Sequence, residues 1–416
     1  MTTPTDTARV ARPGRGLLRS ILLAQESGLV IVIATLMMCL TLFGGTKPQV
    51  ERMGLASDAA VTTEGGDSGT ISVTAGGVTS TYAASEGYEY RGSGTGGTLV
   101  RRSEVNKFLN VENLVLQLVY ASFIAVMAVG MTAVIVMGGI DLSVGSTYAV
   151  AALFGAIALN SLQASALGVE AGGSVTSVGG AGLLPSLAVC LATCCFTGAA
   201  CGLLNGAMIV GLRVHPFIIT LGTMAALRGL VAIPTQAQSV GSFPESLTKG
   251  FFKLDVAGTN PVPPLIMLAT AVVGAVVMAR TVLGRRVYAI GGNEVAAGYA
   301  GIPVGRVKIV VYTLMGALAG LSAAIYLGYL GAAETAAGSG YELKVIAATV
   351  IGGASLSGGR GTAAGAVLGA ILVQLIENGI IILNINQNYN QIVIGGAIIV
   401  AVVLDQLKGR LLPLKG

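Results

Sequence analysis

Gly138-Gly-Ile-Asp-Leu-Ser-Val-Gly-Ser146 is the stretch that decides the fold, because it interrupts a long apolar sequence with a glycine pair and a carboxylate. Apolar segments precede it at about residues 113–137 and follow it at about 144–160. A glycine pair at such a junction predicts that one helix ends there and another begins. A similar pattern returns at Gly352-Gly-Ala-Ser-Leu-Ser-Gly-Gly359. Broken helices at matching places in two halves of a membrane protein are typical of a transport path.

The composition places the whole chain in a bilayer. Of its 416 residues, 53% are hydrophobic and 10% are charged, whereas soluble domains carry about 25% charged residues. We expect an all-α integral membrane protein, a polytopic bundle of about ten transmembrane helices with broken helices and a pseudo-repeat. The expected spans lie at about 22–44, 113–137, 144–160, 183–210, 216–233, 264–282, 307–331, 343–356, 362–383 and 390–406. The eighth is short, which favours a tilted or re-entrant half-helix.

Basic residues set the orientation of these spans. Arg9, Arg12, Arg15 and Arg19 precede the first span, and basic residues in the alternate loops agree with them. By the positive-inside rule both termini are cytoplasmic, in a multi-pass protein of the inner or plasma membrane. The expected parts are a cytoplasmic tail (1–21), a first transmembrane helix (22–44), an extracytoplasmic insert (45–107), a membrane domain (108–407) and a second cytoplasmic tail (408–416).

The insert is polar and rich in Gly, Ser and Thr. Residues 70–74 and 78–82 alternate in polarity around Gly76-Gly77, which predicts a β-hairpin. We expect a small β element on flexible flanks. A second outer loop is expected at about 161–182.

Glycines inside the apolar segments are spaced for helix packing. Gly198, Gly202 and Gly206 fall on one face of a helix, and Gly361, Gly365 and Gly369 are expected to do the same. Small residues on one face let two membrane helices approach closely.

Charged residues inside apolar segments are the first candidates for function. Asp141 either caps the following helix or lines and gates a pore. Arg228 and Glu377 lie on otherwise apolar helices and either pair with each other or line a wet cavity. Glu342 and Lys344 lie at the outer end of the eighth span, where charged residues are expected at the membrane interface without a role in transport.

The inner loop 283–306 carries a short helix with clear end signals. Asn293 suits the N-cap and Glu294 the first turn, whereas Gly301 suits the position after the C-cap and Pro303 stops the helix. The intervening turns are expected to expose Val295, Ala297, Tyr299 and Ala300. Such a helix either docks into a groove of a partner or lies flat on the membrane.

No enzyme motif is readable in the sequence. No phosphate-binding G-x-x-x-x-G-K-[ST] stretch occurs, the single histidine, His215, stands alone in a loop, and no metal-ligand or nucleophile–base pattern is found. We therefore expect no catalytic residue, no metal, no cofactor bound by this chain and no nucleic acid partner.

Several strings of residues resemble a known family. The strings that carry the resemblance are Ala128-Val-Gly-Met131, Gly138 to Ser146, Pro216 to Met224 with Arg228-Gly229, Tyr288 to Glu294, and Gly340-Tyr-Glu-Leu343 leading to Gly352-Gly353. The chain resembles the permease subunits of bacterial ribose/xylose/galactose-type ABC transporters. The resemblance runs from about residue 108 to 407. It implies a permease that imports a monosaccharide. Its implied partners are ABC ATPase subunits, which hold ATP and Mg²⁺, an extracytoplasmic sugar-binding protein, a second permease copy or paralogue, and membrane lipid.

The resemblance also assigns candidate residues. The loop that couples to the ATPase would comprise Gly291, Gly292, Asn293, Glu294, Ala297, Tyr299 and Gly301. The translocation path or helix breaks would comprise Gly138, Gly139, Asp141, Ser143, Gly352, Gly353 and Ser355, with Arg228 and Glu377 as intramembrane charges. The chain departs from the family pattern in its long insert, at Lys344 and at Ala354.

Two other functions remain open from the sequence. An ion-coupled secondary transporter of a small polar solute would use Asp141 and Glu377 as ion carriers, but it leaves the capped inner helix without a role. A membrane scaffold would act through its insert, but it leaves the repeated glycine pair unexplained. The sequence names neither the sugar nor the choice between homodimer and heterodimer.

Overall fold

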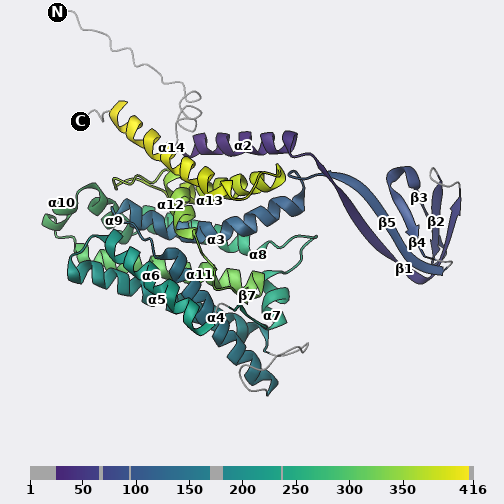
Figure 1. Ribbon diagram of the computed structural model, residues 1–416, viewed down its shortest axis with the longest axis horizontal. Helices are drawn as coiled ribbons and strands as arrows, with labels where there is room; N and C mark the ends of the chain where they lie inside the picture. Colours follow the sequence, from purple (N-terminus) through teal and green to yellow (C-terminus); the bar gives the residue numbers. More distant parts are fainter. Residues whose placement is uncertain (1–24, 65–68, 93–94, 169–180, 236–237, 412–416) are drawn as a thin grey trace, which may run out of the picture. The chain divides into compact units, whose positions relative to one another are not determined.

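The computed structural model describes residues 25–64, 69–92, 95–168, 181–235 and 238–411. The four N-terminal arginines and most of the expected loop 161–182 lie outside the described residues. The chain divides into two compact units, Met37–Leu114 and the rest of the chain. We describe each unit by itself (Figure 1).

All ten expected apolar segments are helical. They correspond to α2 (Gln25–Phe43), α3 (Val111–Val136), α4 (Val144–Leu167), α5 (Leu183–Leu212), α6 (Pro216–Thr235), α8 (Val262–Arg280), α11 (Val304–Leu330), α12 (Tyr341–Ile351), α13 (Ala363–Ile382) and α14 (Tyr389–Leu411). Among the described residues, seven helices are long and apolar enough to cross a membrane: α3, α4, α5, α6, α8, α11 and α13. The protein is therefore mostly helical with several candidate membrane spans, and crossing by all ten stays a prediction.

Two helix ends differ from the expectation. The eighth segment, α12, has 11 residues and ends at Ile351 rather than near residue 356, because Gly352 and Gly353 stop it. Conversely, α4 continues to Leu167. No glycine or proline interrupts residues 160–167, and the helix ends only where Gly168 adopts a left-handed φ of 67°.

Glycines bring two pairs of helices into backbone contact. A Cβ placed on Gly198 or Gly202 would overlap backbone atoms of Gly316 or Tyr312 on α11, so the predicted packing face of α5 is confirmed. Gly365 and Gly369 likewise hold α13 against the backbone of α12. The prediction for Gly361 is wrong, because α13 begins at Ala363 and Gly361 precedes it with a φ of 152°.

The unit Met37–Leu114 contains a five-stranded antiparallel sheet in the order β3-β2-β1-β5-β4. Its strands are β1 (Thr46–Glu64), β2 (Thr70–Ala75), β3 (Val78–Ala83), β4 (Tyr88–Arg91) and β5 (Thr95–Asn106). The hairpin predicted around Gly76-Gly77 is confirmed as β2–β3, with Ala75 opposite Val78. The prediction of flexible flanks is wrong, because the flanks pair with each other over most of β1 and β5, from Thr46 opposite Asn106 onward. Ala59, Ile71, Val73 and Leu99 form the small core of the sheet.

Short elements complete the connections of the membrane unit. α7 (Glu245–Leu247) leads into a π-helical turn at Thr248–Phe252, and the two-residue strands β6 (Val240–Gly241) and β7 (Ala332–Ala333) pair. Between α8 and α11 lie α9 (Val282–Gly292) and α10 (Glu294–Tyr299).

Candidate functional site: two helix breaks and an inner loop

The first glycine pair ends α3 with a Schellman cap. Gly138 adopts a left-handed φ of 84°. Its N–H donates to the Ile135 carbonyl at 2.9 Å, and the N–H of Gly139 donates to the Val134 carbonyl at 2.9 Å. This pair of bonds is the pattern that closes a helix C-terminus on a left-handed residue. The glycine pair therefore breaks the helix as predicted.

The second glycine pair closes α12 in the same way, but one residue later in the motif. Gly353 has the left-handed φ of 101°, and the N–H groups of Gly353 and Ala354 donate to the carbonyls of Val350 and Thr349. Gly353, not Gly352, is therefore the structural counterpart of Gly138. The two similar sequence patterns, which begin at Gly138 and Gly352, are therefore offset by one residue in the structure, because the sequence alone does not show which glycine of a pair is left-handed.

Asp141 is buried just before α4. Its Oδ1 accepts from the backbone N–H of Ser143 at 2.9 Å and from Ser143 Oγ at 2.7 Å. Asn205 Nδ2 on α5 donates to Ser143 Oγ at 2.8 Å. The carboxylate thus holds Ser143, the residue just before α4, and it does not accept from the amides of the first turn itself. Its contacts favour a role at the helix start over a role in lining an open pore.

The carbonyl of Ile140, exposed by the break, faces two side-chain hydroxyls. Tyr312 OH on α11 donates to it at 3.3 Å, and Thr220 Oγ1 on α6 lies 3.4 Å from it and 3.0 Å from the Pro216 carbonyl of its own helix. Side chains from three other helices, α5, α6 and α11, therefore meet the first break. This arrangement satisfies backbone groups that a helix break leaves without partners.

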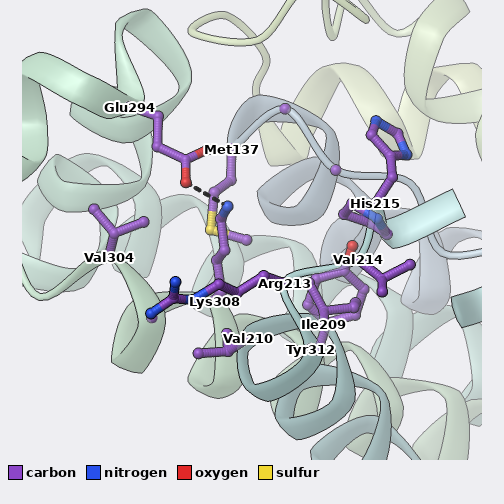
Figure 2. A pocket seen from close by; sticks show the side chains of 14 residues that line it. Met137, Ile209, Val210, Arg213, Val214, His215, Glu294, Val304, Lys308 and Tyr312 are labelled. Carbon is purple, nitrogen blue, oxygen red and sulfur yellow. Dashed lines mark hydrogen bonds and ion pairs between the residues drawn. The ribbon is translucent and has the colours of Figure 1, made fainter.

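A cavity of about 650 Å³ lies beside the first break. Met137, Gly138 and Gly139 line it together with the end of α5, the loop that leads into the start of α6, and the starts of α10 and α11 (Figure 2). Its polar lining includes Arg213, His215, Glu294, Lys308 and Tyr312. The volume falls in the range of small-molecule sites. Of the predicted site residues, Gly138, Gly139 and Glu294 thus share one cavity.

The inner loop has the predicted short helix. Asn293 Oδ1 accepts from the Ala296 N–H at 2.9 Å, which confirms the N-cap. Gly301 has a φ of 82°, and the N–H groups of Gly301 and Ile302 donate to the carbonyls of Gly298 and Ala297. Both ends of α10 are therefore closed within six residues.

The side chains of α10 divide into two sets. Val295 and Tyr299 are 67% and 90% exposed, and they form the face that we call the α10 face. The prediction that Ala297 is exposed is wrong, since it is 5% exposed and packs in the core. Glu294 does not point away from the bundle either. Its Oε1 lies 2.6 Å from Lys308 Nζ, across the cavity wall (Figure 2).

The two intramembrane charges do not pair with each other. Glu377 Oε1 on α13 lies 2.6 Å from Lys344 Nζ on α12 and also accepts from Asn390 at 2.9 Å. Arg228 Nη1 on α6 donates to the Ala337 carbonyl at 2.7 Å. Of the two alternatives left open by the sequence, an Arg228–Glu377 pair is therefore wrong, and Lys344 does more than mark an interface. The helix period of α12 and α13 did not show this pairing, because it depends on how the two helices cross.

Sequence reasoning missed several residues that build the site. Lys308, Asn205, Thr220 and Tyr312 each bond to a predicted residue or to the first break. Asn205 carried a usable signal, since it is a polar residue within the apolar, glycine-rich sequence of α5. Ser355, the remaining candidate, is buried in the second break.

Comparisons with known proteins agree with this architecture. Residues 113–402 match the family of branched-chain amino acid transport system / permease components. The chain belongs to this family. It is 39% identical over 303 residues to the ribose import permease protein RbsC of Escherichia coli K12, covering 72% of this chain and 88% of that protein. It is also 36% identical over 300 residues to the D-allose transport system permease protein AlsC of the same organism, with coverages of 72% and 85%.

A third relative widens the range of imported solutes. The autoinducer 2 import system permease protein LsrC of an Enterobacter strain is 32% identical over 304 residues, covering 73% of this chain and 81% of that protein. No solved structure matches. The family and the seven apolar helices make this chain a multi-pass permease of the inner membrane.

Proposed function

We propose that this chain is the permease subunit of an ABC importer that moves a monosaccharide across the membrane, with ATP hydrolysed by a separate subunit. Relatives whose names specify ribose and allose support the substrate class. The observation that carries the proposal is the α10 face. A six-residue helix, capped at both ends, exposes Val295 and Tyr299 between two membrane helices, and that geometry suits insertion into a groove of a partner.

The assembly follows from this role. ABC ATPase subunits would hold ATP and Mg²⁺ and receive α10, an extracytoplasmic sugar-binding protein would deliver the sugar, and a second copy or a paralogue would complete the permease in its lipid surroundings. This chain itself would bind no cofactor and catalyse no reaction. We place both termini in the cytoplasm, the insert 45–107 on the extracytoplasmic side and all ten apolar helices in the membrane.

The cavity beside the first break fits the inner end of the transport path. Its glycine backbone and its hydroxyl, imidazole and charged side chains can exchange hydrogen bonds with a polyol. Glu294 lies at once on α10 and on the cavity wall. A displacement of α10 would therefore change the cavity directly.

A pull-down tests the proposal. The tagged chain is purified in mild detergent from its own membranes, and ATPase activity is measured in the eluate. We expect an ATPase to co-purify with the wild type and with Tyr299→Phe, which keeps the α10 face apolar. The double variant Val295→Asp/Tyr299→Asp should lose it, because it charges the α10 face without touching the buried Ala297. An ATPase retained by the double variant would refute the docking role.

A further inference from the structure

The last turn of α9 touches both helix breaks. A Cβ on Gly291 would overlap the carbonyl oxygen of Val136 at the end of α3, and it would lie 2.7 Å from the backbone nitrogen of Gly359 in the second break. Gly291 has no left-handed φ, so the absence of a side chain serves only this close approach. Three backbones thus meet with no side chain between them.

The two breaks are also bonded to each other at this point. The N–H of Gly359 donates to the Val136 carbonyl at 2.8 Å. A Cβ on Gly358 would lie 2.6 Å from the Gly291 carbonyl oxygen. The end of α3, the second break and the end of α9 therefore form one contact, which we call the three-backbone junction.

Tyr288 fixes α9 to the second break from one turn earlier. Its hydroxyl donates to the Gly361 carbonyl at 2.7 Å. A tyrosine hydroxyl is protonated at neutral pH, and burial raises the pKa of Tyr288 further above its ordinary value. The bond holds the segment that leads from the junction into α13.

One residue separates α9 from α10. Asn293 is extended, with φ −161° and ψ 104°, and its side chain caps α10 while its N–H donates to the Ala289 carbonyl of α9 at 3.1 Å. The two helices are thus joined by a short elbow that is bonded on both sides. A displacement of α10 must reach the last turn of α9.

We propose that Tyr288 and Gly291 are positioning residues for transport, which hold the end of α9 on both helix breaks so that motion of α10 shifts the two breaks together. The inference rests on the proposed function. It adds the contact through which a displacement of α10 would be transmitted to the membrane helices. Loss of either contact would let the ATPase turn over while the breaks stay still.

The test is the number of sugar molecules imported per ATP hydrolysed. The full chain is reconstituted in proteoliposomes with its ATPase and binding protein, using radiolabelled ribose as probe. Tyr288→Phe keeps the ring and removes the hydroxyl, and we expect the ratio to fall about fivefold, the size expected from one neutral hydrogen bond. Gly291→Ala should lower it further. ATP hydrolysis and co-purification of the ATPase should be unchanged in Tyr288→Phe.

Two control variants match these changes elsewhere. Gly211→Ala adds the same methyl group to a helical glycine with open space around it, and Tyr389→Phe removes a hydroxyl from an exposed tyrosine. Both should keep the wild-type ratio. An unchanged ratio in Tyr288→Phe and Gly291→Ala would overturn the inference, as would an equal loss of assembly, hydrolysis and uptake, which indicates a merely structural role. Absence of ATP-driven uptake in the wild type, with ribose and with other monosaccharides as probes, would instead overturn the proposed function.

Discussion

The two helix breaks share one backbone conformation and differ in the groups that form hydrogen bonds around it. Each ends a helix with a Schellman cap on a left-handed glycine, Gly138 or Gly353. Around the first break, side chains from α5, α6 and α11 supply the hydrogen bonds. Around the second, backbone groups bond to one another, and the Tyr288 hydroxyl adds one side-chain donor.

The second break shows how this is done. The N–H of Ser355 donates to the Arg360 carbonyl at 3.0 Å, the N–H of Gly358 donates to the Ser355 carbonyl at 2.9 Å, and Gly359 reaches Val136. Gly358 and Gly359 have left-handed φ values of 85° and 74°. Side chains in a hydrogen-bond network can shift when an atom is added or removed beside them, whereas closely packed backbones cannot make room for an added atom. The comparison therefore predicts that the second break tolerates less change than the first.

The largest effect should come from Gly358→Ala. Its φ is left-handed and its new Cβ would meet the Gly291 carbonyl oxygen at 2.6 Å, so the strain of about 1–2 kcal/mol for a left-handed residue adds to an overpacking cost of about 1–3 kcal/mol. Gly138→Ala has a similar φ but open space around the Cβ, and only the first cost applies.

Thermal unfolding measures this difference. The chain has no tryptophan, but Cys190 and Cys194 are free and buried, so a thiol-reactive dye reports unfolding. The melting temperature should fall two- to threefold more in Gly358→Ala than in Gly138→Ala. Equal shifts would remove the distinction between the breaks.

Next in size is Lys344→Ala. Lys344 and Glu377 pair across α12 and α13, the helices that flank the second break, with side chains 20% and 13% exposed. Removing Lys344 leaves the mostly buried Glu377 carboxylate without its cation in an apolar bundle, and we expect about 3 kcal/mol of destabilisation. Lys344→Met combined with Glu377→Met should restore most of the stability in the same dye assay. A double variant as unstable as the single one would show that the pair is not the cause.

Substitutions of Asp141 test the side-chain hydrogen bonds of the first break. Asp141→Asn keeps an Oδ1 acceptor for both Ser143 donors, so stability and uptake should change little. Asp141→Ala leaves a buried N–H and hydroxyl without their partner, at a cost of about 2 kcal/mol. A stable Asp141→Asn protein without uptake would contradict the structural role and point to a carboxylate that carries an ion.

The smallest effect on the membrane unit should follow replacement of the sheet. Gly54 and Thr98 face each other across β1 and β5, so an Asn-Gly turn can replace residues 55–97 as a two-residue hairpin. Because the sheet belongs to a separate compact unit, the melting temperature of the remaining protein should stay within a few degrees. A collapse of expression would show that the membrane unit depends on the sheet.

The sequence predicted the elements that follow from local chemistry. Apolar runs located the helices, the caps at Asn293 and Gly301 were legible because each is satisfied within one turn, and Gly76-Gly77 marked its hairpin. The long pairing of β1 with β5 was missed because it joins residues far apart in the chain. Burial of Ala297 was missed for the same reason, because the residues that cover it lie outside the short loop sequence from which its exposure was predicted.

The site was predictable at the level of segments and not of partners. The glycine pairs and the inner loop were found separately. Their meeting at Gly291, Val136 and Gly359 depends on how three helix ends converge, and no periodicity encodes that. Arg228 and Glu377 were found as costly charges, but Lys344 and Ala337 could be assigned to them only from the structure.

Uptake of radiolabelled ribose into proteoliposomes tests the central claim most directly. The assay is run with and without ATP inside the proteoliposomes, and with the ATPase and the binding protein added or left out. The account predicts uptake only when ATP and both partners are present. Uptake by this chain alone, driven by a proton or sodium gradient, would contradict it.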